Sequence, residues 1–86
     1  MGELVGVVTG AGSGIGRATV EHMRACGARV AGWDLRDESL EWLRDAPDSL
    51  TATVDVRDPD QVADAAAQVR DRWGGVDFLV NSAGVF

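Results

Sequence analysis

The 86-residue sequence contains no lysine and no tyrosine, and it has only one cysteine and two prolines. Without a lysine the chain cannot carry a phosphate-binding P-loop, which depends on that side chain. The same two absences remove side chains that often transfer protons or anchor ligands in enzyme sites. The single cysteine, Cys26, excludes a disulfide within the chain and predicts a reducing compartment, for which the cytoplasm is the default expectation.

Acidic side chains outnumber basic ones, and 14 Asp and Glu residues against 8 arginines give a formal net charge of -6. The arginines are scattered, so we expect no nucleic acid partner, because such binding depends on clustered cations that release counterions. No apolar run is long enough to span a bilayer, and residues 1–6 match neither a secretory signal nor a myristoylation site. We therefore expect no membrane partner either.

Short apolar runs alternate with segments of helical periodicity, a pattern typical of βαβ units in a parallel sheet. We expect four strands, at residues 4–8, 28–33, 51–56 and 76–80, and three helices, at residues 14–26, 37–45 and 59–73. Right-handed crossovers then give the strand order 3-2-1-4, with the first two helices on one face and the third on the other. The predicted fold class is α/β, a partial Rossmann-type parallel sheet.

Capping and packing signals accompany two of the expected helices. Asp58 is expected to cap the third helix, with Pro59 at its first position, Gln61 completing a capping-box-like arrangement, and Gly74 ending it. Helical spacing predicts an inward face for each of the two helices. These faces comprise Val62, Ala66, Val69 and Trp73 in the third helix, and Ile15, Ala18, Thr19, Met23 and Cys26 in the first.

Nothing inside the chain marks a domain boundary, since the sequence has no internal repeat, low-complexity tract or linker. We expect residues 1–86 to form the amino-terminal half of one nucleotide-binding Rossmann domain, without a second domain. In the expected strand order the last strand lies at an edge, yet residues 78–80 are continuously apolar, as in an interior strand. An open apolar edge predicts self-association or pairing with another chain.

A glycine-rich loop, from Thr9 to Gly16, lies between the first expected strand and the first expected helix. Glycines let the backbone turn tightly and approach a phosphate, while the helix that begins near Gly14 directs unpaired N–H groups at its negative charge. This context indicates binding of a dinucleotide pyrophosphate. The alternative is a plain strand-to-helix turn, which leaves the polar residues at later strand ends unexplained.

Four motifs follow one another along the chain. T-G-x-x-x-G-x-G covers residues 9–16, Asp34 ends the second strand, Asp55-Val56 ends the third, and Asn81-Ser82-Ala83-Gly84 follows the fourth. With these motifs the chain resembles the amino-terminal half of a short-chain dehydrogenase/reductase over essentially its whole length. The resemblance implies an NAD(P)-dependent oxidoreductase that transfers hydride between the cofactor and an alcohol or carbonyl compound.

The same resemblance implies that all four motifs contribute to cofactor binding. Gly10, Ser13, Gly14 and Ile15, with Gly16 completing the loop, line the pyrophosphate and its ribose; Asp55 and Val56 contact the adenine; Asn81, Ala83 and Gly84 lie beneath the ribose and nicotinamide. Ser82 stands where the family often has Asn, and a hydroxyl can still bond locally.

Asp34 bears on the choice of cofactor. A carboxylate at the tip of the second strand can accept both hydroxyls of the adenosine ribose and repels the 2′-phosphate of NADP. We therefore expect NAD to be preferred over NADP, and Ser13 agrees, because NADP-preferring relatives often have a basic residue at that position. Arg17 and Arg36 leave NADP open. The plainer interpretations are a solvated carboxylate at Asp34 and a turn carboxylate at Asp55.

Catalysis in this family depends on a Ser, a Tyr and a Lys four residues after the Tyr, all beyond the fourth strand. By the resemblance, these 86 residues hold no catalytic residue and are expected to be inactive alone. A second hypothesis is a non-catalytic dinucleotide-binding module that self-associates through its last strand, and a third is a chain without a stable fold. His22 is interpreted as a helix-flank residue, so no metal is expected. The substrate and the oligomeric state stay open.

Overall fold

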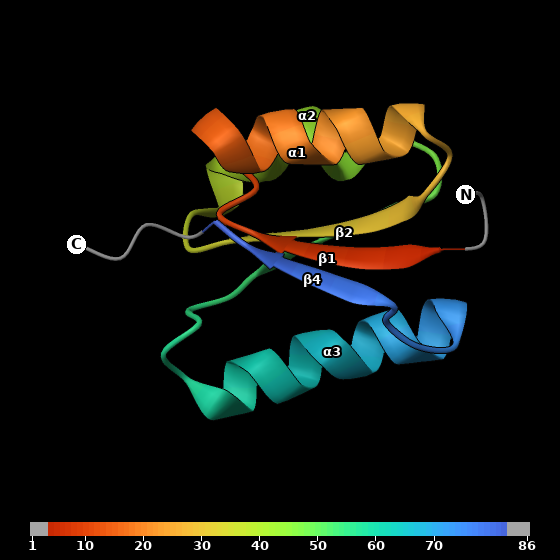
Figure 1. The fold of residues 1–86 in the computed structure, drawn as a ribbon. Helices are drawn as coiled ribbons and strands as arrows, with labels where there is room; N and C mark the ends of the chain where they lie inside the picture. The colour runs from red at the N-terminus through yellow and green to blue at the C-terminus, as the bar shows by residue number, and fades with distance from the viewer. Residues whose placement is uncertain (1–3, 83–86) are drawn as a thin grey trace.

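A computed structural model describes residues 4–82 and places a parallel sheet between helices on both faces (Figure 1). Helices α1 and α2 cover one face of the sheet and α3 covers the other. The elements, in chain order, are β1 (Val5–Thr9), α1 (Gly14–Ala25), β2 (Arg29–Asp34), the 3-10 turn η1 (Asp37–Leu40), α2 (Glu41–Arg44), β3 (Ser49–Thr53), α3 (Pro59–Trp73) and β4 (Phe78–Asn81).

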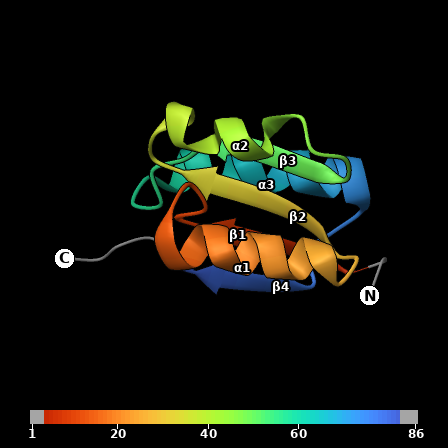
Figure 2. The same ribbon diagram turned by 90° about the horizontal axis from the view of Figure 1, so that it is seen from above.

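The four strands within residues 4–82 are parallel and lie in the order β3-β2-β1-β4, which confirms the expected order and fold class. β1 is central, since Val7 pairs with Ala31 of β2 on one side and with Leu79 of β4 on the other. Figure 2 shows the strands side by side, with β3 and β4 at opposite edges. The connection from β3 through α3 to β4 therefore crosses beneath the first two strands.

Two hydrophobic clusters, one on each face, hold the layers together. The cluster under α1 and α2 joins Val8 and Val30 of the sheet to Val20, Leu40 and Leu43. The cluster over α3 joins other sheet residues to that helix, and its buried members are Val5, Val7, Ala31, Trp33, Val54, Ala65 and Val69. Burial of each large aliphatic side chain contributes about 1.5 to 3 kcal/mol, so both layers add stability to the sheet.

The face that α1 buries differs from the predicted one. Gly16 and Val20 are buried and Met23 is half-buried, whereas Ile15 is 79% exposed and Cys26 is also exposed. Ala18 is exposed as well, so the predicted face was correct at Met23 and, in part, at Thr19. The cause is steric, because Gly16 packs on the preceding loop and this contact sets the rotation of the helix about its axis.

The second helical segment is shorter and less regular than predicted. It comprises the four-residue 3-10 turn η1 and the four-residue α2, rather than one helix over residues 37–45. Ser49 donates its hydroxyl to the carbonyls of Leu43 and Ala46, at 3.0 and 2.6 Å, and so satisfies the end of α2. Strand β3 therefore begins at Ser49, two residues before the predicted start.

Strand β3 also ends earlier than the predicted residue 56. The Val54 amide still donates to the Asp34 carbonyl at 2.8 Å, but the Asp58 amide then bonds to the Asp55 carbonyl and closes a turn. Asp55 and Val56 therefore lie in the connection to α3 instead of in the strand. The other predicted strands are shifted by one or two residues.

Helix α3 has the predicted ends. The Asp58 carboxylate accepts from the amides of Asp60 and Gln61, Pro59 is the first helical residue, and Gly74 closes the helix with a φ of 90°. The Gln61 side chain reaches back to the cap, because its Nε2 donates to Asp58 Oδ2 at 3.1 Å. Its oxygen accepts from the Asp55 amide at 2.8 Å and not from the Asp58 amide, so the arrangement resembles a capping box without the second backbone bond. The predicted inward face is buried at Val69 and half-buried at Val62, Ala66 and Trp73, and it also includes the buried Ala65.

Strand β4 is held at its start by reciprocal bonds between Asp77 and Val5. The Val5 amide donates to the Asp77 carboxylate and the Asp77 amide donates to the Val5 carbonyl, both at 2.8 Å. The Phe78 ring then covers Gly6, where any added Cβ would overlap the ring. Leu79, at the free edge of the sheet, is 60% exposed.

No helix among residues 4–82 is long and apolar enough to cross a membrane.

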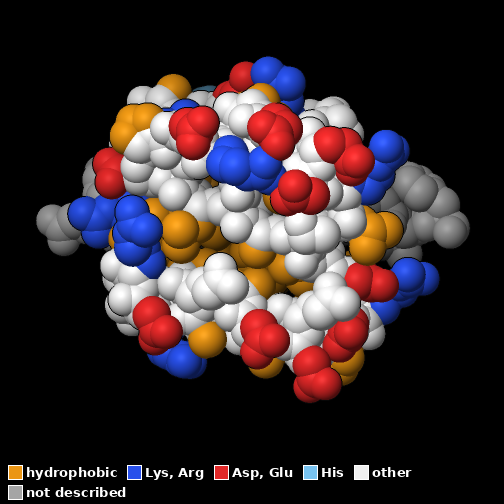
Figure 3. Space-filling model, turned by 180° about the vertical axis from the view of Figure 1, so that it is seen from behind, with side chains coloured by type: hydrophobic (Ala, Val, Ile, Leu, Met, Phe, Trp, Pro, Cys, Tyr) orange, Lys and Arg blue, Asp and Glu red, His pale blue; other side chains and the backbone are white. Residues whose placement is uncertain are grey.

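The edge formed by β3 carries its own surface pattern. Figure 3, viewed from this side, shows apolar side chains across the middle of the face and acidic side chains above and below them. A shallow groove of about 250 Å³ lies there, between β3 and α3, lined by Ala52, Val54, Gln61 and Asp64 among others. The residues that line this groove lie far along the sequence from the glycine-rich loop.

Candidate functional site

The glycine-rich loop follows the carboxyl end of β1. At this end of the sheet, the connections to the two neighbours of β1 run over opposite faces. β2 and β4 flank β1. Helix α1, which precedes β2, covers one face of the sheet, and α3, which precedes β4, covers the other. This arrangement is the topological switch point at which open parallel sheets bind ligands. In Figure 2 the strand arrowheads and the start of α1 lie at the same end of the molecule.

Backbone conformation explains two of the glycines in the loop, and close packing explains a third. Gly10 and Gly14 have φ angles of 66° and 59°, in the left-handed region that other residues rarely adopt. Gly16 is required for a different reason, because a Cβ there would overlap the Gly10 carbonyl oxygen and lie 2.6 Å from Ser82 Oγ. The absence of side chains thus brings the first turn of α1 against the loop.

The amino terminus of α1 offers unpaired N–H groups to solvent. The first turn of an α-helix has amides without a partner inside the helix, and the side chain of the cap residue, Ser13, makes no capping hydrogen bond. No acidic residue lies in this first turn, and both Ser13 and Gly14 are exposed. Uncapped amides and the positive end of the helix dipole together favour an anion at this place.

Asp34 lies beside this loop at the end of β2. Its Oδ2 accepts from the Gly12 amide at 2.8 Å, and its Oδ1 accepts from the Arg36 amide at 3.2 Å. Next to it, the Ala11 amide donates to the Trp33 carbonyl at 3.0 Å, so the loop is anchored to β2 at two successive residues. Each carboxylate oxygen can accept more than one hydrogen bond, which leaves capacity for hydroxyl donors.

The arginines near the loop have partners. The Arg17 guanidinium lies 4.5 Å from the centre of the Trp42 ring and 3.7 Å from a Glu21 carboxylate oxygen. Arg36 lies 3.5 Å from Glu38. Both arginines thus have competing acidic neighbours, which lowers their capacity to attract an additional phosphate.

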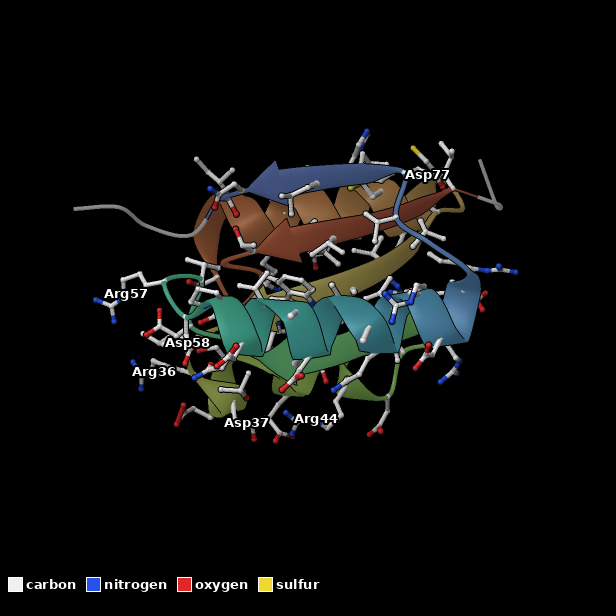
Figure 4. The ribbon with its side chains drawn as sticks, turned by 90° about the horizontal axis from the view of Figure 1, so that it is seen from below. Arg36, Asp37, Arg44, Arg57, Asp58 and Asp77 are labelled. Atoms are coloured by element: carbon white, nitrogen blue, oxygen red, sulfur yellow. The ribbon has the colours of Figure 1, made fainter. Side chains whose placement is uncertain are left out.

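Asp55 is oriented toward Arg57. Both nitrogens of the guanidinium fork donate to its carboxylate at 3.0 Å, and the Arg57 amide donates at 2.9 Å. These hydrogen bonds hold the pKa of the Asp55 carboxyl below its usual value. Figure 4 shows Arg57 and Arg36 at one end of the molecule and Asp77 at the other. Asp55 thus lies in a loop at the predicted end of the sheet, together with the exposed Val56.

Asn81 and Ser82 are tied to the end of β1. Thr9 Oγ1 donates to Asn81 Oδ1 at 2.7 Å, and Ser82 Oγ donates to the Thr9 carbonyl at 2.5 Å. The structure therefore brings the last motif and the glycine-rich loop together across β1 and β4. The other two predicted residues of this motif, Ala83 and Gly84, lie outside the described residues.

Sequence reasoning missed the importance of Gly12. Its amide bonds Asp34, and a Cβ there would overlap Ser39 Cβ and approach Asp34 Oδ2 to 2.8 Å. The only signal in the sequence is its place between the motif glycines Gly10 and Gly14. Within residues 4–82, no group of three or more His, Cys, Asp or Glu side chains could hold a metal ion.

Comparisons with known proteins identify relatives of this chain. The levodione reductase of Leifsonia aquatica is 39% identical over 86 residues, covering 92% of this chain and 32% of the relative. A Brucella melitensis structure described as a short-chain dehydrogenase/reductase of the glucose/ribitol dehydrogenase type is 36% identical, with a TM-score of 0.89 over 98% of this chain and 37% of that one.

A second solved structure contains a bound cofactor. It is a 3-ketoacyl-(acyl-carrier-protein) reductase from Brucella melitensis complexed with NADH, 27% identical, with a TM-score of 0.83 over 88% of this chain and 32% of that one. This chain thus spans about a third of the length of the relatives it matches. The family model for short chain dehydrogenases matches residues 5–86. With its parallel sheet, glycine-rich loop and acidic strand end, the chain belongs to the short chain dehydrogenase family.

Proposed function

We propose that this chain is the cofactor-binding segment of an NAD-dependent short-chain oxidoreductase that interconverts an alcohol and a carbonyl compound. The observation that carries the proposal is the 2.8 Å bond from the Gly12 amide to Asp34, which joins an anion-binding loop to an acceptor for sugar hydroxyls. The cofactor, when bound, supplies the hydride acceptor or donor at nicotinamide C4. One domain, residues 1–86, forms the binding segment.

The residues proposed to hold the cofactor fall into groups, one for the anionic pyrophosphate and others for the uncharged sugar and ring parts. The amides of α1 and the glycines of the loop receive the pyrophosphate, since the first turn of α1 is uncapped and a Cβ at Gly12 or Gly16 would overlap neighbouring atoms. Asp34 accepts from the adenosine ribose. The full proposed set is Gly10, Ser13, Gly14, Ile15, Gly16, Asp34, Asp55, Val56, Asn81, Ala83 and Gly84.

A preference for NAD over NADP follows from the charge at Asp34. A 2′-phosphate on the ribose would lie beside this carboxylate, and the unfavourable interaction is strongest where water is partly excluded. Arg17 and Arg36, the nearest basic candidates, have acidic neighbours of their own. These contacts support NAD as the better ligand.

Turnover needs groups that these 86 residues lack. The sequence contains neither the tyrosine nor the lysine that the family resemblance assigns to catalysis, so in this proposal the proton that accompanies hydride transfer comes from a group outside these 86 residues. We propose that the segment alone binds cofactor without converting substrate, and that it acts in the cytoplasm, in keeping with its single, exposed Cys26.

A second candidate is a non-catalytic dinucleotide-binding module that self-associates. Leu79 favours it, because this apolar side chain is 60% exposed on an edge strand that pairs on one side only with another strand of residues 4–82. Sedimentation at high concentration tests the self-association on which this second candidate depends, and a chain that stays monomeric would contradict it.

Calorimetric titration of the chain with NAD and with NADP tests the proposed function. We expect NAD to bind more tightly, and Asp34→Ala to bring the two affinities together because it removes both the ribose acceptor and the repulsion. Asp45→Ala is the control, since it removes one exposed carboxylate from the end of α2. Equal affinities for the two nucleotides in the unaltered chain would contradict the NAD preference.

A further inference from the structure

We propose that Gly12 is a positioning residue for Asp34 and thereby sets the discrimination between NAD and NADP. The inference rests on the proposed NAD site and adds a determinant outside the residues assigned to it. Gly12 belongs to the loop between β1 and α1, whereas Asp34 ends β2. The two are brought together only by the fold.

Two backbone amides fix the Asp34 carboxylate. Gly12 donates to Oδ2 at 2.8 Å and Arg36 donates to Oδ1 at 3.2 Å, so each oxygen has one amide donor. Hydrogen bonds from two directions restrict rotation of the carboxylate and leave its remaining lone pairs facing away from both donors. A ribose diol needs two acceptors at a fixed separation, which an oriented carboxylate provides.

The space around Gly12 is closed by the same neighbours. A Cβ on this residue would overlap Ser39 Cβ, and it would lie 2.8 Å from Asp34 Oδ2 and 3.0 Å from the Ser39 carbonyl oxygen. Gly12 is not among the glycines with positive φ. Alanine therefore suits the backbone conformation of this residue, and its cost comes from the side chains and backbone that it displaces.

The effect of Gly12→Ala on cofactor binding depends on which neighbour the added methyl group displaces. Ser39 is fixed within η1 by the bond from its amide to the Arg36 carbonyl at 3.1 Å, and that segment packs through the buried Leu40. The Asp34 carboxylate moves more easily, because it can turn about its side-chain torsions. A methyl group at Gly12 also overlaps Ser39 Cβ, so the loop must shift away from η1. That shift, together with rotation of the carboxylate, separates Asp34 from its amide donor and from the place of the ribose.

Selectivity then changes in a defined direction. NAD loses two well-placed hydrogen bonds to its ribose, whereas NADP loses mainly a repulsive neighbour. We expect Gly12→Ala to weaken NAD binding about tenfold, equivalent to about 1.4 kcal/mol, and to change NADP binding less. The ratio of the two dissociation constants thus falls toward that of Asp34→Ala.

Calorimetric titration of the 86-residue chain with both nucleotides tests this inference. Gly75→Ala is the matched control, because nothing lies within 4 Å of a Cβ at that position and its φ is not positive. Circular dichroism and thermal melting of each variant report on folding. Should Gly12→Ala fail to fold, the double variant Gly12→Ala with Ser39→Gly removes the overlap with Ser39 Cβ and retains the approaches to the Ser39 carbonyl and to Asp34.

The outcomes separate the inference from the proposed function. A lower NAD-to-NADP preference in the folded Gly12 variant, with Gly75→Ala unchanged, supports positioning by Gly12. An unchanged preference, or an equal loss of affinity for both nucleotides, overturns it while the Asp34→Ala result still stands. If Asp34→Ala leaves the preference intact, the proposed ribose site fails, and the role of Gly12 fails with it.

Discussion

Thr9 and Asn81, at opposite ends of the chain, are joined by a 2.7 Å hydrogen bond from Thr9 Oγ1 to Asn81 Oδ1. The bond ties the carboxyl ends of β1 and β4 together at the point where the glycine-rich loop begins. Ser82 Oγ adds a second tie to the Thr9 carbonyl. The edge strand is thus fixed beside the loop by side chains as well as by the strand ladder.

Thr9→Val tests this relationship. We expect a loss of about 1 kcal/mol in the free energy of unfolding, because Thr9 is buried and valine keeps its shape but not its hydroxyl. Urea denaturation followed by circular dichroism measures the loss. Thr19→Val is the control, since that hydroxyl donates to the Ile15 carbonyl within one exposed helical turn. A loss no larger than that of the control would show that the Thr9 bond contributes little.

Gly16→Ala should damage the loop more than Gly14→Ala. At Gly16 a Cβ overlaps the Gly10 carbonyl, so overpacking costs about 3 kcal/mol. At Gly14 nothing lies within 4 Å, and only the φ of 59° opposes alanine, at a cost of about 1 to 2 kcal/mol. Thermal melting ranks the two variants, and the reverse ranking would contradict the packing of α1 on the loop.

Removal of the Arg57 guanidinium should raise the pKa of Asp55 toward its usual value. Because the folded pKa is lowered, the pair stabilises the fold above the unfolded pKa of about 4, and this contribution is lost as the pH falls through the folded pKa. The stability gap between the unaltered chain and Arg57→Ala therefore closes in acid. Carbon NMR of the Asp55 carboxyl follows the pKa itself.

Arg36→Ala is the control for that titration. Arg36 is also a highly exposed arginine with an acidic neighbour, but its partner is Glu38. We expect the Asp55 pKa to stay unchanged in this variant. A shift of similar size in both variants would indicate a general effect of net charge instead of the Arg57 contacts.

Self-association through β4 predicts a specific response to charge at Leu79. Leu79→Glu should lower the sedimentation coefficient of any dimer to that of the monomer, because a carboxylate cannot be buried at the paired edge without a large cost. Leu35→Glu is the matched control for Leu79→Glu, since the two leucines are 59% and 60% exposed. If both variants sediment like the unaltered chain, association through this edge is excluded.

The order of the strands and the ends of α3 were predictable because their causes are local or topological. Asp58, Pro59 and Gly74 act within a turn of the helix, where the sequence itself supplies the donors, acceptors and conformations. Right-handed crossovers then restrict how successive parallel strands are placed. The predicted order was confirmed for these reasons.

The rotation of α1 and the role of Gly12 were not predictable in the same way. Ile15 has the character of a buried residue but is 79% exposed, because the contact of Gly16 with Gly10 turns it outward. Gly12 matters through Asp34 and Ser39, which are distant in sequence. Of the predicted site, Asp34 and Asn81 lie beside the loop, whereas Asp55 bonds Arg57.

The central place of β1 has a consequence for biosynthesis. β1 can pair with β2 as soon as residue 34 has left the ribosome, but its other edge is completed only by residues 78–81. During the intervening translation, the nascent chain presents a hydrogen-bonding edge of its own central strand, and such edges are prone to incorrect pairing. Chaperones that shield unpaired strands are therefore expected to act on the nascent chain before β4 emerges.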